Sequence, residues 1–363
     1  PRMRRCSTPT PMTDQLPDRL AGVLLGMAVG DALGLPRERL RPETAARRFG
    51  GPGLRHALLF GRGMISDDTE HATLVAQALL AQPDDADGFL RRLAWGLRGW
   101  FIAGPAGLGK ATLRACVRLW LAVPPGRAGV VSAGNGPAMR APILGACLAH
   151  AAQRDAYVLA STRLTHRHDE ADDGARLVAL AAARAVRAAP GSLDAPALWA
   201  ELIAAAATPA LAERMARLAA LLAEGAPPAE AALALGLDRG VTGYIAHTVP
   251  MALYCWLAAP DNARRAIESA IALGGDTDTV AAVVGGLAGA LCGETALPRE
   301  WIDGLWEWPR SARWLREVAR RLSLTFGEGQ RPGPASMAWW LIPARNAVFL
   351  LVVLAHGFRR MLG

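Results

Sequence analysis

Apolar residues recur at intervals of three and four along most of the chain, which is the spacing that predicts α-helices with a buried face. The first predicted helix runs from Asp18, a residue type suited to capping, to about Leu33. Further helices are predicted at 66–81, 86–102, 107–122, 137–152, 169–188, 194–206, 208–224, 241–259, 261–273, 277–292 and 310–322. The breaks fall at clusters of Gly, Pro, Asn and Asp, and no run of alternating apolar residues predicts strands. The predicted fold class is therefore all-α.

The two ends of the chain depart from this pattern. We expect residues 1–17 to form a flexible leader and residues 18–326 a single helical domain. Residues 327–363 begin as a Gly/Pro linker and continue into a nine-residue apolar run at 347–355, which is shorter than the ~20 residues that a membrane-spanning helix needs. This segment is predicted to be an extra C-terminal helix that packs on the domain. A helix that contacts a membrane surface or a partner is the alternative.

Composition supports a folded chain and argues against nucleic-acid binding. Of the 363 residues, 52% are hydrophobic and 20% are charged, which is too apolar for a disordered protein. The net charge of +8 lies at the ends: residues 1–48 carry +4 and residues 297–363 carry +5, while the rest carries −1. Lys110 is the single lysine among 40 basic residues. Such a distribution, with arginine nearly everywhere, indicates a compositional bias rather than a surface that binds nucleic acid.

The cysteines and the first residues indicate a cytoplasmic protein. Five cysteines are widely spaced, and no pair has the spacing of a metal site. This favours a reducing compartment. The first residues also lack the apolar run of a signal peptide.

Two clusters of oxygen-bearing side chains precede predicted helices. The first is Ser66-Asp67-Asp68-Thr69. Adjacent carboxylates bracketed by hydroxyls are the hard oxygen ligands that Mg²⁺, Mn²⁺ and Ca²⁺ prefer. A helix N-cap is the alternative, because Ser or Asp in this position accepts hydrogen bonds from the first amides of a helix.

The second cluster is Asp276-Thr277-Asp278-Thr279, which follows a pair of glycines. If the glycines bend the backbone sharply, the two carboxylates point at a common centre. A glycine turn followed by a capping residue is again the alternative. Two such clusters on a chain with few charges favour a site for two metal ions, because the carboxylates would repel one another without cations.

The first predicted helix carries a further candidate. Gly22, Gly26 and Gly30 recur at four-residue spacing, which allows another helix to approach closely. Glu38 follows this helix in a loop, where it either points into a cleft or remains solvated.

Two other segments are candidates for ligand contacts. Gly134–Arg140 combines small residues with exposed amides before a predicted helix, which suits a ligand phosphate, although many turns share the pattern. His166 could orient a substrate hydroxyl or phosphate, although a single histidine is more often packed or solvated. Its neighbours Thr165 or Asp169 could instead cap the helix that follows.

Over roughly residues 18–295 the chain carries five motifs, which are, in order, Gly-Asp-Ala-x-Gly with Glu38, Ser-Asp-Asp-Thr, Gly-Asn-Gly-x-Ala-Met-Arg, Thr-His and Gly-Gly-Asp-Thr-Asp-Thr. These motifs and their order resemble those of the ADP-ribosylglycohydrolase family. The resemblance implies a compact orthogonal helical bundle with two Mg²⁺ or Mn²⁺ ions in a central cleft. The metal ligands that it implies are Ser66, Asp67, Asp68, Asp276, Asp278 and Thr279. The ADP-ribose contacts that it implies are Gly134, Asn135, Gly136, Met139 and His166. Ser66 departs from the threonine of most members but keeps the hydroxyl.

The same resemblance implies metal-assisted hydrolysis of an N- or O-glycosidic bond at C1″ of the distal ribose. ADP-ribose would be released from a modified protein side chain or from a small conjugate. The metals would orient the ribose hydroxyls, and Glu38 or a metal-bound water would carry protons. Glu38 and Asp276 are both candidates for the general base.

Two other functional classes remain as alternatives. A binding protein of the same fold would occlude an ADP-ribosylating toxin or a modified partner. A Mg²⁺-dependent phosphohydrolase would use the same acidic clusters, but the Gly-Asn-Gly and Thr-His segments disfavour it. The oxygen side chains retained at all six implied metal positions favour catalysis.

Overall fold

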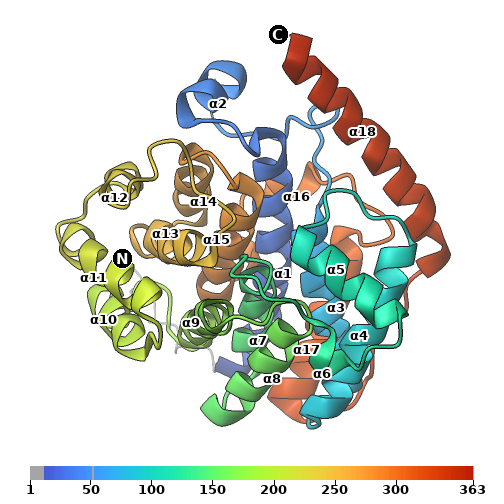
Figure 1. Ribbon diagram of the computed structural model, residues 1–363. Coiled ribbons are helices and arrows are strands. Elements are labelled where there is room, and N and C mark those ends of the chain that lie inside the picture. The colour runs from blue at the N-terminus through green and yellow to red at the C-terminus, as the bar shows by residue number, and fades with distance from the viewer. Residues whose placement is uncertain (1–11, 51–52, 363) are drawn as a thin grey trace, which may run out of the picture.

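Two helices rich in small residues, α1 (Met12–Gly34) and α15 (Thr277–Cys292), lie side by side at the centre of the fold (Figure 1). The structure is a computed structural model that describes residues 12–50 and 53–362. A Cβ atom on Gly26 would lie 2.1 Å from the carbonyl oxygen of Gly285, and one on Gly285 would lie 2.0 Å from that of Gly26. Only glycines allow the two backbones to approach so closely. The contact predicted from the four-residue glycine spacing is therefore confirmed, and α15 is the partner helix.

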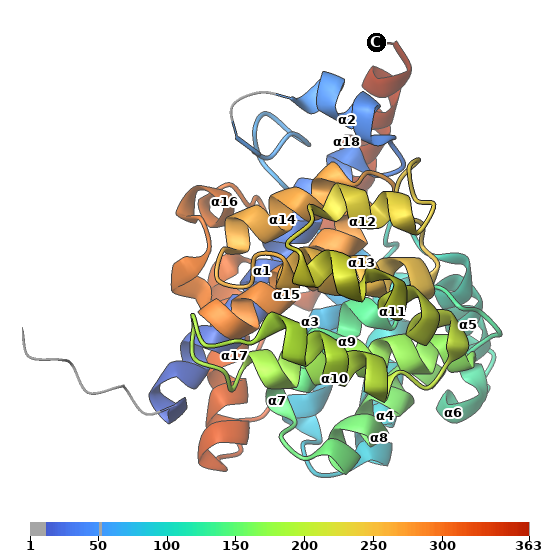
Figure 2. The ribbon, with the colours of Figure 1, turned by 90° about the vertical axis from the view of Figure 1, so that its left-hand side faces the viewer.

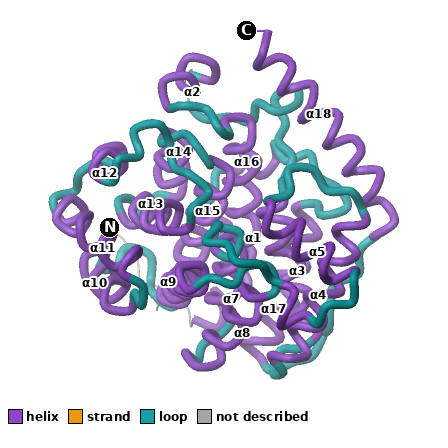
Figure 3. Tube along the Cα trace, in the orientation of Figure 1, coloured by secondary structure: helices purple, strands orange, loops and turns teal. Residues whose placement is uncertain are grey.

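The remaining helices surround this pair, as Figure 2 shows from a second side. They are α2 (Pro42–Phe49), α3 (Asp67–Ala81), α4 (Ala86–Ile102), α5 (Lys110–Trp120), α6 (Pro125–Ala128), α7 (Ala141–Cys147), α8 (Ala151–Arg163), α9 (Asp169–Ala185), α10 (Ala195–Ala205), α11 (Pro209–Ala223), α12 (Pro228–Ala234), α13 (Ile245–Leu257), α14 (Ala263–Ala272), α16 (Arg299–Asp303), α17 (Ala312–Glu328) and α18 (Ile342–Leu362). Short 3₁₀ turns are η1 (Leu35–Arg37), η2 (Ala138–Arg140), η3 (Glu294–Ala296) and η4 (Trp339–Leu341). Figure 3 shows helices and loops throughout the described residues, which confirms the all-α fold.

The start of α1 differs from the prediction. The helix begins at Met12 and includes Pro17, so the predicted leader overlaps it at 12–17, while residues 1–11 lie outside the described part of the chain. Asp18 is therefore inside the helix and is not its cap. Its carboxylate accepts hydrogen bonds from the backbone amide and the hydroxyl of Thr295, both at 3.3 Å.

The helix predicted at 137–152 is also wrong, because the chain breaks there into η2, α7 and the start of α8. The sequence pattern missed α8 because its buried face is largely polar. Arg154, Ser161 and Thr162 are buried on that face together with Tyr157 and Val158. The segments α2, α6, α12 and α16 were not predicted either, and all four are short.

The last helix, α18, is fixed to the domain by buried charges. Arg345 donates to both carboxylate oxygens of Glu307, at 2.8 and 2.6 Å, and to Glu70 at 3.3 Å. Arg310 and the Trp100 indole donate to the same Glu70, at 2.8 and 2.6 Å. The side chains of Glu70, Arg310 and Arg345 are each at most 2% exposed. The prediction that this helix packs on the domain is confirmed.

Among the described residues, two segments are long and apolar enough to cross a membrane, by length and composition. One is Gln15–Arg37, whose apolar window is 94% buried in the core, and the other is Trp339–Arg360, which has a mean hydropathy of 1.7 and is 28% buried. The second segment is longer than the nine-residue apolar run at 347–355. The run stops at the polar residues that flank it, whereas the helix continues through Arg345 and His356.

Candidate active site

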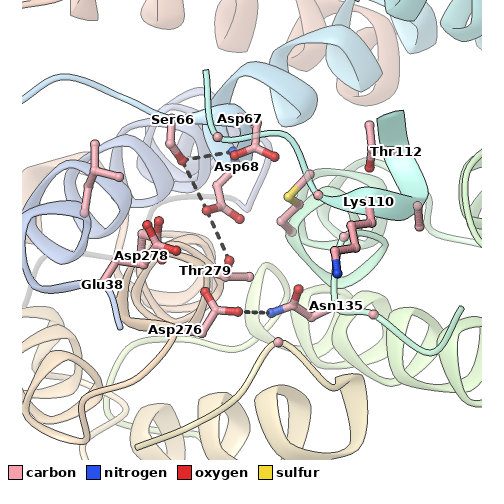
Figure 4. Close-up of a pocket in the computed structure, with 18 of the residues that line it drawn as sticks. Glu38, Ser66, Asp67, Asp68, Lys110, Thr112, Asn135, Asp276, Asp278 and Thr279 are labelled. Carbon is pink, nitrogen blue, oxygen red and sulfur yellow. Dashed lines mark hydrogen bonds between the residues drawn. The ribbon is translucent and has the colours of Figure 1, made fainter. Parts of the chain in front are cut away.

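The predicted site residues from five segments of the chain meet at one cleft with a volume of about 390 Å³. The cleft lies where α1 ends and where α3 and α15 begin (Figure 4). The twelve predicted residues that line it are Glu38, Ser66, Asp67, Asp68, Gly134, Asn135, Gly136, Met139, His166, Asp276, Asp278 and Thr279. The structure thus brings together every residue predicted as a metal ligand, an ADP-ribose contact or a general base, and their chemical roles remain predictions.

Asp31 of α1 holds the first acidic cluster in place. Its carboxylate accepts hydrogen bonds from the Ser66 amide at 2.9 Å, the Thr69 amide at 3.2 Å and the Thr69 hydroxyl at 2.6 Å. The Ser66 hydroxyl also caps α3 by accepting a bond from the Asp68 amide at 3.3 Å. The capping alternative is therefore correct for Ser66, and it coexists with a place on the cleft wall. Asp31 is the aspartate of the Gly-Asp-Ala-x-Gly motif, but the sequence predicts no role for it.

A glycine turn holds the second cluster against the Glu38 loop. Gly274 and Gly275 have φ values of +70° and +78°, which glycine adopts without strain. The Gly275 amide donates to the Leu40 carbonyl at 2.8 Å, and its carbonyl accepts from the Arg39 amide at 2.7 Å. These bonds place Glu38 beside the start of α15, where Asp278 lies. The sharp bend expected from the two glycines is confirmed.

The carboxylates at the cleft are crowded and short of partners. Burial and the charges of neighbouring carboxylates raise the pKa of Asp68 well above its usual value, and the same two causes raise the pKa of Asp278. One carboxylate oxygen of each, Oδ1, is buried without a hydrogen-bond partner among the described residues. Thr279 and Ser66 donate to the other oxygen of Asp68, at 3.2 and 3.3 Å.

This donor set suits divalent cations, because buried carboxylate and hydroxyl oxygens are the ligands that Mg²⁺ and Mn²⁺ prefer. A cation would also supply the partners that the two Oδ1 atoms lack. As the side chains stand, however, no group of three or more His, Cys, Asp or Glu in the described part of the chain is close enough to hold a metal ion. The fit therefore rests on the unpartnered oxygens and the donor chemistry.

The sequence predicts exposed amides in the glycine-rich segment, but two of the three amides at 134–136 are hydrogen-bonded. The Gly134 amide donates to the Ser132 hydroxyl at 3.2 Å, and the Asn135 amide donates to the Gly243 carbonyl at 3.0 Å. Of the three amides at 134–136, that of Gly136 is the one without a partner among the described residues. The Asn135 side chain donates to Asp276 at 2.8 Å and so joins this segment to α15 (Figure 4).

His166 faces the same segment and is held in place by two consecutive buried hydrogen bonds. Arg140 donates to the Thr165 hydroxyl at 2.7 Å, and that hydroxyl is 2.9 Å from Nδ1 of His166. Burial and the nearby Arg140 charge lower the pKa of His166 to about 3, so the ring is neutral. The cap of α9 is His168, so neither Thr165 nor Asp169 plays that part.

The lining of the cleft also includes residues that had no predicted role in it. Lys110 and Thr112 come from the start of α5, and Figure 4 shows Lys110 across the cleft from the acidic clusters. Phe349 and Val353 come from α18. The unique lysine was visible in the sequence, but its proximity to the carboxylates depends on how α5 packs.

Comparison with known proteins agrees with this site. The sequence pattern of the ADP-ribosylglycohydrolase family matches residues 12–332. The ADP-ribosyl-[dinitrogen reductase] glycohydrolase of Rhodospirillum rubrum is 29% identical over 301 residues, which cover 79% of this chain and 90% of that protein. The human ADP-ribosylhydrolase ARH3 is 29% identical over 331 residues, which cover 78% and 86% of the two chains.

A solved structure described as an ADP-ribosylglycohydrolase-related protein complex has a TM-score of 0.63 at 29% identity and covers 85% of this chain and 98% of its own. The family match includes both acidic clusters and ends before α18. The chain therefore belongs to the ADP-ribosylglycohydrolase family.

Proposed function

We propose that the protein hydrolyses the glycosidic bond between C1″ of an ADP-ribose unit and a nitrogen or oxygen acceptor. The observation that carries this proposal is the convergence of two acidic clusters, a glycine-rich segment and a neutral histidine on one cleft. The names of the relatives support the same chemistry. The acceptor is a protein side chain or a small ADP-ribosyl conjugate.

Two divalent cations, Mg²⁺ or Mn²⁺, are the cofactors that we propose for this cleft. The residues that would hold them are Ser66, Asp67, Asp68, Asp276, Asp278 and Thr279. Bound there, the cations would offset the crowded negative charge and orient the hydroxyls of the ribose.

Glu38 is the residue that we assign to proton transfer. Hydrolysis breaks the bond from C1″ to the acceptor, forms a bond from C1″ to a water oxygen, and moves one water proton to the leaving atom. Burial raises the pKa of Glu38, and a group whose pKa lies closer to neutrality exchanges protons more effectively. The Asp276 carboxylate accepts a hydrogen bond from Asn135, which fixes its orientation and suits a metal ligand.

His166 would bind a phosphate or hydroxyl of ADP-ribose as a neutral donor. The Thr165 hydroxyl lies 2.9 Å from Nδ1 of His166 and 3.5 Å from the Thr162 carbonyl, and we propose that it donates its proton to the nearer Nδ1. This leaves the proton of the imidazole on Nε2, which is the atom that faces Gly134.

The test separates metal retention from turnover. Asp278→Asn removes one carboxylate charge with little change in size, and we expect it to abolish both Mn²⁺ binding by titration calorimetry and ADP-ribose release. Glu38→Gln should keep Mn²⁺ binding and lose at least ~10²-fold in kcat, the usual contribution of a general acid or base. Asp303→Ala, an exposed carboxylate on α16, is the matched control and should change neither.

The substrates are Arg-, Ser- and O-acetyl-linked ADP-ribose, each with Mg²⁺ or Mn²⁺. Full activity in metal-free protein would contradict the proposal. Release of phosphate in place of ADP-ribose would identify a phosphohydrolase instead.

A further inference from the structure

The outward face of α18 is an apolar ridge. Leu350, Leu351, Leu354 and Phe358 recur along one side of this helix and are 45, 67, 52 and 62% exposed. The opposite side is fixed to the domain by the buried side chains of Arg345 and Phe349. The ridge is therefore held in place while its apolar side chains face solvent.

A second apolar surface continues from the start of α18. A groove of about 660 Å³ runs between α4 and η4, and Ile342 at the beginning of α18 lines it. Its lining includes Trp95, Trp120 and Trp339, which are 62, 46 and 70% exposed. Figure 1 shows α4, α5 and α18 on the same side of the molecule. We call the ridge and this groove together the apolar belt, and so large an exposed apolar surface is typical of an interaction site.

Two stretches that form most of the apolar belt carry basic residues and no carboxylates. Residues 88–121, which include most of α4 and all of α5, hold six basic residues and no Asp or Glu. Residues 335–363 hold three basic residues and again no Asp or Glu. Of these nine, Arg345 is neutralised by buried carboxylates. Arg91 pairs with Asp85, and Lys110 lines the cleft instead of the belt. Arg92 and Arg98 line the groove itself, and Arg359 and Arg360 follow the ridge, so the surface fits a partner that is both apolar and anionic.

We propose that the apolar belt docks the protein on an anionic lipid surface, with α18 lying in the plane of the membrane interface. The Trp pair 339–340 at one end of the ridge and Arg359–Arg360 at the other are residue types that anchor helices at the interface. The ridge offers a protein partner no side chain for directional hydrogen bonds, which protein interfaces usually contain. A lipid surface needs none.

The contacts of α18 decide between lying on a membrane and crossing it. Crossing would require Arg345 to leave Glu307 and Glu70, and the buried Glu307 carboxylate would lose its ion-pair partner. Docking keeps those ion pairs and places only the exposed ridge against lipid. The inference does not depend on the proposed hydrolase activity, because none of the ridge residues lines the cleft.

The experiment is co-sedimentation of the full chain with vesicles of phosphatidylcholine, with and without ~30% phosphatidylserine. We expect binding to the vesicles that contain phosphatidylserine, and weaker binding as salt rises to ~0.5 M. The double variant Leu351→Asp/Leu354→Asp should reduce the partition coefficient by about tenfold or more, since it places charges on the ridge. Leu233→Asp is the matched control, because Leu233 is 63% exposed on α12, outside the apolar belt.

A second variant keeps the test decisive if the first does not fold. Trp339→Ser/Trp340→Ser changes side chains that are 70 and 64% exposed, and it should also weaken binding. Failure of the wild type to bind anionic vesicles would overturn the proposal, as would binding that neither double variant weakens. A dimer in solution that Leu351→Asp/Leu354→Asp converts to monomer, without vesicle binding, would assign the surface to self-association instead.

Discussion

The buried, neutral His166 makes a measurable prediction about stability and pH. Burial and the Arg140 charge lower its pKa from the ordinary 6.5 to about 3 in the folded protein. The unfolded chain has no such environment, so there the histidine takes up a proton below about pH 6.5. Stability from His166 is therefore fully present above that pH and is lost progressively as the pH falls toward 3.

The variant His166→Gln removes this titration. One pKa unit corresponds to about 1.36 kcal/mol, so between about pH 7 and pH 5 the wild type should lose about 2 kcal/mol that the variant keeps. The free-energy difference between the two proteins changes by this amount, whatever its value at neutral pH. Other titrating groups are common to both proteins and cancel in the difference.

Urea unfolding followed by circular dichroism, at about pH 7, 6 and 5 without divalent cations, gives the two free energies by linear extrapolation. The same difference at all three values of pH would refute the reasoning. A difference that changes in favour of the wild type as pH falls would show that the folded state binds a proton at His166. It would also contradict the assignment of this residue as a neutral donor.

Two further predictions concern the framework of the site. Gly26→Ala places a Cβ atom 2.1 Å from a carbonyl oxygen of α15 and should lower the free energy of unfolding by about 1–3 kcal/mol, whereas Gly99→Ala, which meets nothing within 4 Å, should raise it by about 0.5–1 kcal/mol. Equal effects in chemical denaturation would contradict the close α1–α15 contact. Arg345→Met should cost about 3–5 kcal/mol and speed hydrogen exchange in α18, because Glu307 stays buried without its ion-pair partner, whereas Glu70 keeps Arg310. Adding Glu307→Gln to Arg345→Met should recover much of that loss, and no recovery would show that the ion pair is not the cause.

Local pattern in the sequence was sufficient for the elements that carry the acidic clusters. The predicted bounds of α4 and α15 agree with the structure, and α3 begins one residue after the predicted Ser66. Capping residues and apolar spacing act within a few residues, so they can be recognised without knowledge of the fold. Where the buried face of a helix is polar, as in α8, this signal is weak and the helix was missed.

The charge distribution shows where local counting is insufficient. Counted along the chain, the positive charge lies at the two ends, and the middle is nearly neutral. In the folded protein, Arg92 and Arg98 of α4, from that middle, line one groove with Trp339 of η4 and Ile342 of α18. Proximity between distant segments arises from packing, which the apolar period of each helix does not specify.

The sequence by itself determined the helical class, the positions of the acidic clusters at helix starts and the family. Tertiary structure decided how those clusters meet. Asp31 orients the start of α3, and Gly275 joins the Glu38 loop to α15. Tertiary structure also placed α18 on the cleft wall and left its ridge exposed. The physical reason is that helix formation is governed by neighbours a few residues apart, whereas these contacts join residues that are distant in the chain and depend on close helix packing.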